Sequence, residues 1–290
     1  MRAVEVVSAG AQALVQDLGR PGHAELGVPP SGALDVPALR LANRLVGNAE
    51  DAAGIEALLG GLSLRARTPV TVAVTGAPVA VDVDGAAAGS NVPVHLAAGS
   101  TVTLGNPDEG LRCYLALSGG VDVPAELGSR SRDVLSGIGP APLAEGDVLP
   151  LGRPGVPCGA DVVAPARVPA ELGVPVWLGP REDWFAEAAS ALAGPWTVTP
   201  ESNRVGLRLD GTPLRRTPDR ADAELPSEGL LTGAIQVPPN GLPVLFLADH
   251  PTTGGYPVIG VVDADALPAL AQARPGSTVR FLPSAAPSSG

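Results

Sequence analysis

Lysine is absent from this sequence, and all 19 of its basic residues are arginine. Genomic base composition is a sufficient explanation of that preference, but the chemical consequence is the same whatever its origin. The chain has no phosphate-binding P-loop lysine, no lysine for a Schiff base with pyridoxal phosphate and no lysine to carry biotin. Covalently bound biotin on this chain is therefore excluded, and a nucleotide would be held in another way or by another protein.

Further absences narrow the class of protein. The three histidines, His23, His95 and His250, and the two cysteines, Cys113 and Cys158, follow no metal-binding spacing, so we expect no metal site and no disulfide. A net charge of −11 and the lack of a basic patch argue against nucleic acid and against anionic membranes as partners. The sequence also lacks a serine-hydrolase elbow, a dinucleotide-binding glycine fingerprint and an EF-hand loop. An independent serine hydrolase or dehydrogenase is therefore disfavoured.

Aromatic residues make up only 3% of the chain, whereas it holds 37 glycines and 32 prolines. The core must then consist mainly of Val, Leu, Ala and Ile, and the frequent turns favour many short strands over long helices. No apolar run approaches the ~20 residues that cross a bilayer. Glu5 also stands where a signal peptide would be apolar. We expect a soluble, cytoplasmic protein with no membrane partner.

Alternating apolar residues predict strands in both halves of the chain, separated by a stretch rich in Pro, Gly and Ala. This pattern predicts a mainly β fold with a few short helices, arranged as two barrel-like modules. The first module spans residues 1–155, a connection spans 156–173, the second module spans 174–283, and a disordered tail spans 284–290. One helix should begin after Asp35 as N-cap, a second should span about 182–192, and a third should end at Gln272.

The densest polar segment follows an apolar strand at residues 244–247. This strand delivers Asp249 and His250, and two threonines and two glycines come next. A carboxylate beside a histidine is able to orient the imidazole for proton transfer. Glycines without a Cβ let backbone N–H groups approach an anionic oxygen closely. The alternative is a tight turn between strands, capped by Thr252 and Thr253, with His250 exposed.

Arg204 and Arg208 are four residues apart, so on a strand both would point to one face. Two guanidiniums suit a carboxylate or phosphate, with Glu228 facing them, although surface ion pairs explain the same residues. In the N-terminal loop, a salt bridge between Asp17 and Arg20 is favoured over a role in substrate binding.

Several segments together resemble one protein family. They are the runs at 15–22, 27–35, 42–48, 118–122, 127–131, 202–209, 233–238 and 249–257. The family contains the C subunit of bacterial 5-oxoprolinase, the KipA antagonists of the kinase inhibitor KipI, and the carboxyltransferase region of urea carboxylase (allophanate hydrolase subunit 2-like proteins). One departure occurs at 205–209, where the family often has Met-Gly-Tyr-Arg-Leu and this chain has Val-Gly-Leu-Arg-Leu, which affects packing only.

The resemblance implies two cyclophilin-like β-barrel modules and a protein that is inactive alone. It implies the C subunit of an ATP-dependent 5-oxoprolinase, which opens 5-oxoproline to glutamate with a KipI-like B subunit and an A subunit. ATP would bind at the level of the complex, and the B subunit is expected on a separate chain. Two alternatives stay open: the carboxyltransferase component of a biotin-dependent system like urea carboxylase, and a non-catalytic KipA-like antagonist of KipI.

The candidate site is therefore a polar pocket for a small-molecule substrate. The expected proton-transfer residues are His250 and Asp249, and Arg204 and Arg208 would neutralise a substrate carboxylate or a phosphorylated intermediate. The remaining expected substrate-binding residues are Gln236, Asn240, Thr252, Thr253, Gly254, Gly255, Tyr256 and Glu228, with Asp17 and Arg20 as additional candidates.

Overall fold

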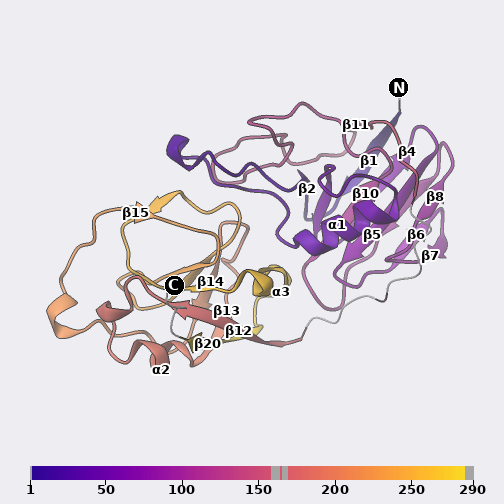
Figure 1. The fold of residues 1–290 in the computed structure, drawn as a ribbon. Coiled ribbons are helices and arrows are strands. Elements are labelled where there is room, and N and C mark those ends of the chain that lie inside the picture. Colours follow the sequence, from indigo (N-terminus) through magenta and orange to yellow (C-terminus); the bar gives the residue numbers. More distant parts are fainter. Residues whose placement is uncertain (1, 158–163, 165–168, 285–290) are drawn as a thin grey trace. The chain divides into compact units, whose positions relative to one another are not determined.

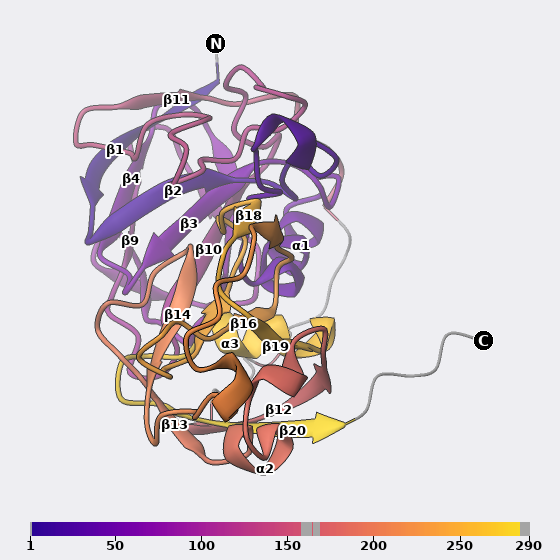
Figure 2. The ribbon, with the colours of Figure 1, turned by 90° about the vertical axis from the view of Figure 1, so that its left-hand side faces the viewer.

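The computed structural model describes residues 2–157, 164 and 169–284, so Cys158 lies outside the described residues. Contacts between residues divide the chain into two units (Figures 1 and 2). Unit 1 comprises Met1–Arg20 and Ser31–Val168, and unit 2 comprises Pro21–Pro30 and Pro169–Gly290. The prediction of a mainly β chain with a few short helices is confirmed.

Unit 1 is built from two antiparallel sheets and one helix. The six-stranded sheet has the order β11-β1-β4-β9-β6-β7 and the five-stranded sheet has the order β2-β3-β10-β5-β8. The strands are β1 Ala3–Ala9, β2 Gln12–Gln16, β3 Gly54–Leu58, β4 Leu62–Ala66, β5 Val70–Gly76, β6 Val81–Val83, β7 Ala86–Ala88, β8 Val94–Leu96, β9 Thr101–Leu104, β10 Arg112–Leu117 and β11 Val148–Pro150, and the helix is α1 Val36–Leu45.

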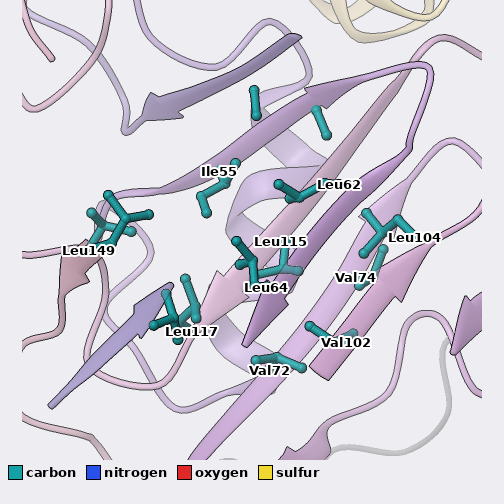
Figure 3. Close-up of a cluster of buried hydrophobic side chains, with 14 of the residues drawn as sticks. Ile55, Leu62, Leu64, Val72, Val74, Val102, Leu104, Leu115, Leu117 and Leu149 are labelled. Atoms are coloured by element: carbon teal, nitrogen blue, oxygen red, sulfur yellow. The ribbon is translucent and has the colours of Figure 1, made fainter. Parts of the chain in front are cut away.

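The main core of unit 1 contains apolar side chains from both sheets. Figure 3 shows Ile55 and Leu115 of the five-stranded sheet in one cluster with Leu62, Leu64 and Leu104 of the six-stranded sheet. Each of these side chains is almost fully removed from solvent. Burial of one such side chain contributes roughly 1.5–3 kcal/mol, so this cluster is the main source of stability in unit 1.

Strand β10 is buried on both faces because α1 covers the face opposite the main core. Alternate residues point to opposite faces of a strand, so Leu115 and Leu117 join the main core while Tyr114 and Ala116 pack with helix residues. The helix begins as predicted, since the Asp35 carboxylate accepts a hydrogen bond from the Ala38 N–H at 3.0 Å.

Unit 2 contains a closed barrel with the order β12-β19-β16-β17-β14-β13-β20 and a two-stranded sheet, β15-β18. Its strands are β12 Glu171–Leu178, β13 Pro195–Val198, β14 Gly206–Asp210, β15 Glu228–Gly229, β16 Ala234–Gln236, β17 Val244–Phe246, β18 Thr253–Gly254, β19 Val258–Val262 and β20 Thr278–Ser284. Its helices are α2 Ala188–Leu192 and α3 Leu267–Ala271, with 3-10 turns at Ala24–Leu26, Glu182–Trp184, Pro218–Arg220 and Ala264–Ala266.

The barrel closes where β12 runs parallel to β20, with Val174 opposite Phe281. Alternate residues of β12 are buried, which matches the period of two in the sequence. Strand β20 continues through Ser284, which pairs with Trp177, and the rest of the expected tail lies outside the described residues.

The single helix predicted over about 182–192 is interrupted in the structure. A 3-10 turn at Glu182–Trp184 is followed by an extended residue, Phe185, before α2 begins. Phe185 forms a β-bridge with Arg216, and the Ala186 N–H donates to the carbonyl of Arg215 at 2.9 Å. These backbone hydrogen bonds to residues 215 and 216 replace the hydrogen bonds of a continuous helix. The sequence of residues 182–192 alone does not reveal this pairing.

Among the helices that the structure describes, none has the length and apolar character needed to cross a membrane. Cys113 is buried in the main core of unit 1, with its Sγ 3.7 Å from the carbonyl oxygen of Ala77.

Tyr114 is a buried polar residue on the α1 side of β10. Its hydroxyl accepts a hydrogen bond from the Asp35 N–H at 2.8 Å and donates to Glu56 Oε2 at 2.7 Å, and Glu56 also pairs with Arg112. Burial, and next the negative charges of Glu56 and Asp35, raise the pKa of the Tyr114 hydroxyl well above its ordinary value.

We predict that the free energy of unfolding falls as the pH rises above about 10, where the unfolded chain releases the phenol proton and the folded chain retains it. Tyr114→Phe should remove this contribution. At pH 7 it should cost about 1–3 kcal/mol, because the buried Asp35 N–H loses its acceptor. Urea unfolding between pH 7 and pH 11 checks both effects, and an unchanged alkaline slope in the variant would contradict the assignment.

Candidate functional site

The polar segment that follows β17 is anchored by a buried ion pair. The Asp249 carboxylate accepts from Arg204 at both oxygens, with Nε–Oδ2 at 2.9 Å and Nη2–Oδ1 at 3.1 Å. The Asp249 N–H also donates to the Arg204 carbonyl at 3.2 Å. The side chains of Asp249 and Arg204 are 0% and 2% exposed respectively. A pair of this geometry joins two loops at one end of the barrel and resists separation, because either charge alone would be buried without compensation.

Arg204 and Arg208 do not share a face, which corrects the prediction from their spacing. Strand β14 begins at Gly206, so Arg204 lies in the preceding turn, outside the strand alternation. Its guanidinium is bound to Asp249, whereas Arg208 is exposed. The Arg204 side chain is therefore buried in an ion pair, whereas the Arg208 side chain is open to solvent.

His250 follows the ion pair directly and is only 3% exposed. Its Nδ1 lies 2.7 Å from the carbonyl oxygen of Pro251, and its ring centroid lies 6.1 Å from that of Phe246. A carbonyl only accepts hydrogen bonds, so Nδ1 carries a proton, and in a neutral ring Nε2 would be the acceptor nitrogen. The imidazole is thus held in one tautomer by its neighbour in the chain.

His250 and Thr252 line a pocket of about 450 Å³ in unit 2. The remaining lining residues are mostly apolar and come from two further segments: Pro21, Gly22, Ala24, Val28, Pro29 and Pro30, and Leu230, Leu231 and Thr232. A single imidazole in largely apolar walls is an arrangement typical of small-ligand sites, in which few polar groups fix the orientation of the ligand. The sequence did not predict that residues 21–30 line this pocket. A loop rich in Pro and Gly has no periodic pattern that indicates which module it contacts.

Four of the other expected site residues line two different pockets of unit 2. Gly255 and Tyr256 line a pocket of about 370 Å³ together with Arg216. Arg208 and Asn240 line another pocket of about 400 Å³. The Asn240 Oδ1 accepts from the Leu242 N–H at 3.1 Å, which closes a local turn. The structure therefore does not gather all the predicted residues around His250.

Several of the residues that were expected to bind substrate instead stabilise the segment that follows β17. Buried Gln236 donates through Nε2 to the Tyr256 carbonyl at 3.0 Å, and a Cβ on Gly254 would lie 2.5 Å from the same Nε2. A side chain at position 254 would therefore require the Gln236 amide to move. Thr253 pairs with Gly229 in the short β15-β18 sheet.

Glu228, the partner of Gly254 in this sheet, does not face Arg204 or Arg208 as predicted. It forms a two-point ion pair with Arg181, with Nε–Oε2 at 3.2 Å. The hydrogen bonds from Arg181 lower the pKa of the Glu228 carboxyl below its ordinary value. Arg181 was not among the predicted residues, and the sequence offers no signal for this long-range pair.

In unit 1, Asp17 and Arg20 each have their own partners, so the predicted salt bridge between them is wrong. The Asp17 carboxylate accepts from the Ser129 and Ser131 hydroxyls and from the Gly19 and Arg130 N–H groups. Arg20 donates to the backbone carbonyls of Glu126 and Ser131. In the parts of the chain that the structure describes, no three His, Cys, Asp or Glu residues are close enough to hold a metal ion.

Residues 26–283 match the protein family described as the carboxyltransferase domain, subdomain A and B. The chain is 39% identical to the C subunit of the 5-oxoprolinase of Escherichia coli K12 over 288 residues, which covers 96% of this chain and 90% of that protein. It is 33% identical to urea amidolyase of Lachancea kluyveri, covering 97% of this chain but 17% of that protein. The crystal structure of TTHA0988 matches with a TM-score of 0.87 and 35% identity, over 97% of this chain and 56% of that chain.

We predict that Asp249→Asn lowers the free energy of unfolding by about 3–5 kcal/mol, because it leaves the Arg204 charge buried without its counter-charge. The matched control is Glu171→Gln, which breaks the exposed pair with Arg280 and should cost less than about 1 kcal/mol. The double variant Arg204→Met/Asp249→Leu should recover most of the loss. Urea unfolding measures all three, and equal stability of D249N and E171Q would overturn the role of this pair.

Proposed function

The chain belongs to the carboxyltransferase-domain family, and from this membership we propose that it is the C subunit of an ATP-dependent 5-oxoprolinase, which converts 5-oxoproline to glutamate. The observation that carries the proposal is the match along almost the whole chain to a relative named as the C subunit of a 5-oxoprolinase. A second relative of the same name, from Haemophilus influenzae, matches over 96% of this chain.

That both of these relatives are named as one subunit of an enzyme supports an assembly in which this chain works with other subunits. We propose that they are a KipI-like B subunit and an A subunit, and that ATP supplies the driving force for ring opening within the complex. The sequence has no lysine and no P-loop to hold the phosphates of ATP on this chain. No step of the reaction is therefore assigned to a nucleotide bound here.

We assign proton transfer to His250 because the structure combines three requirements at this residue. It lines a pocket large enough for a small substrate, its ring is held in one tautomer by Pro251, and its position is fixed by the adjacent ion pair. Opening a lactam adds water across the C–N bond, so the leaving nitrogen must gain a proton. In this proposal the imidazole takes a proton from the attacking water and returns one to the leaving nitrogen.

Asp249 then has a positioning role. Its carboxylate is bound to Arg204, so it holds the start of the loop that carries His250. The lining of the pocket, in which Pro29, Val28 and Leu230 take part, is mostly apolar, so its few polar side chains, His250 among them, would orient the substrate.

A second candidate function is supported by the matches to urea amidolyases and by the description of the family itself. In that case the complex would transfer a carboxyl group, and biotin would be carried on another chain because this one has no lysine. The aligned region is only 17% of the Lachancea kluyveri protein, so the activity of that whole protein does not transfer directly to this chain.

The first test is to co-express this chain with A- and B-type subunits and to measure ATP-dependent release of glutamate from 5-oxoproline. We predict release by the complete complex and a loss of more than about 100-fold when this chain is omitted. A well-folded complex that releases no glutamate would contradict the proposed reaction.

Within the active complex, His250→Ala should lower kcat by about 10²–10⁴-fold, the usual contribution of general acid–base catalysis. His95→Ala is the matched control, because His95 is an exposed residue of β8 in unit 1. Co-purification with the partner subunits verifies assembly of both variants. Equal turnover by H250A and H95A would remove His250 from the mechanism.

A further inference from the structure

The two most exposed leucines of the described part of the chain both flank the pocket that contains His250. Leu26 is 63% exposed and Leu231 is 66% exposed, and both belong to unit 2. Leu231 lines the pocket directly, and Leu26 belongs to the same 3-10 turn as the lining residue Ala24. We call Leu26 and Leu231 the rim. Large exposed apolar side chains beside a pocket are typical of a surface that another protein covers.

Both leucines of the rim are carried by hydrogen-bonded turns. The Gly27 N–H donates to the Ala24 carbonyl at 2.9 Å, which closes the turn that bears Leu26. The Leu230 N–H donates to the Thr252 carbonyl at 2.9 Å, which ties the segment before Leu231 to the loop that carries His250. Because the backbone is held in this way, a partner would bind the rim with little loss of conformational entropy in this chain.

The pocket itself has no fixed positive charge. Its polar side chains are His250, Thr232 and Thr252, and no arginine is among the lining residues that the structure describes. The chain has no lysine. Arg204 forms the buried ion pair with Asp249, and the proposed mechanism uses His250 for proton transfer. None of these groups is therefore free to act as the counter-charge of a bound anion.

The proposed substrate, 5-oxoproline, is a lactam that carries a carboxylate. The hydroxyl groups of Thr232 and Thr252 are able to form hydrogen bonds with the uncharged lactam. A carboxylate that is covered without an opposite charge loses its hydration and is strongly disfavoured. The pocket therefore suits the lactam and lacks the group that the carboxylate requires.

The charge near the rim favours a basic partner. Glu25 is exposed in the same turn as Leu26. The chain as a whole carries a net charge of −11. Opposite charge accelerates and orients the association of two proteins. The partner that fits this surface therefore combines an apolar contact with an arginine or a lysine.

We propose that a partner subunit completes this site: it covers Leu26 and Leu231, and it contributes an arginine or a lysine that binds the substrate carboxylate at the mouth of the pocket. The inference rests on the proposed function, because it takes 5-oxoproline as the substrate. It adds a docking surface and a separate origin for two of the groups in the site. This chain supplies the imidazole of His250, and the partner supplies the positive charge.

The docking surface is tested by titrating the A- and B-type subunits, one at a time, onto the wild-type chain and onto Leu26→Asp and Leu231→Asp. We expect each variant to weaken the binding of one partner subunit by at least about tenfold, because a carboxylate replaces an apolar contact. Both side chains are exposed, so the variants should fold as the wild type does. Leu135→Asp, at a leucine of unit 1 that is 51% exposed, is the matched control and should leave binding unchanged.

Unchanged binding of both subunits by L26D and L231D would overturn the docking surface. Light scattering of the isolated chain tests the other possible occupant, a second copy of the chain. A wild-type dimer that L231D converts to a monomer would show that a second copy covers the rim, and it would overturn the assignment to a partner subunit.

The origin of the positive charge is tested with 5-oxoproline and 2-pyrrolidinone, which is the same lactam without the carboxylate. In calorimetric titrations, the isolated chain should bind both compounds equally, and the complex should prefer 5-oxoproline by at least about tenfold. Leu231→Arg places a cation on the pocket wall of this chain. It should give the isolated chain a preference for 5-oxoproline of at least about threefold, whereas Leu135→Arg should give none.

A second variant keeps the test decisive if the isolated chain binds both lactams too weakly to rank them. In the complex, at concentrations that saturate the partner, Leu231→Asp sets a like charge beside the substrate carboxylate. It should lower the preference for 5-oxoproline by at least about threefold. An unchanged preference would show that the carboxylate binds elsewhere and would overturn the proposal.

A preference of about tenfold in the isolated wild-type chain would show that this chain supplies the charge, and no preference in the complex would show that no subunit supplies it. Either result would overturn the proposal. Both are separate from glutamate release. A complex that prefers 5-oxoproline but releases no glutamate keeps the partner's cation and loses the proposed reaction. Glutamate release together with full preference in the isolated chain keeps the reaction and loses the cation.

Discussion

The buried pair between Arg204 and Asp249 is the interaction on which the functional end of the barrel depends. Two charges that are almost fully removed from water must stay together, because separating them would expose each to a large desolvation penalty. The pair therefore fixes the turn before β14 and the loop after β17 in one arrangement. His250 follows Asp249 directly, so its position in the pocket is set by electrostatics as much as by packing.

In unit 1, two acidic side chains are stabilised by networks of hydrogen bonds. Asp17 receives four donors and Tyr114 joins Glu56 to the N-terminus of α1, so both acidic groups are satisfied. These completed networks help to stabilise unit 1.

The features that sequence alone predicts are those set by local chemistry. The N-cap at Asp35 follows from residue type and position, and it is found in the structure. The errors come from one strand boundary and from long-range pairings. The prediction that Arg204 and Arg208 share a face assumed that Arg204 lies in the strand, but β14 begins two residues after it. The partner of Glu228 lies 47 residues away along the chain, and the partners of Arg20 lie at least 106 residues away. No local pattern contains such pairings, and the same holds for the packing of the 21–30 segment in unit 2.

The reaction that we propose opens a ring with water and does not transfer a carboxyl group. Mass spectrometry of the product formed from 5-oxoproline and ATP in the presence of ¹³C-bicarbonate tests it most directly. We predict glutamate without ¹³C from the complex that contains this chain. A product that carries one ¹³C, and whose formation depends on a biotinylated partner, would contradict the hydrolase assignment and establish the carboxyltransferase reaction.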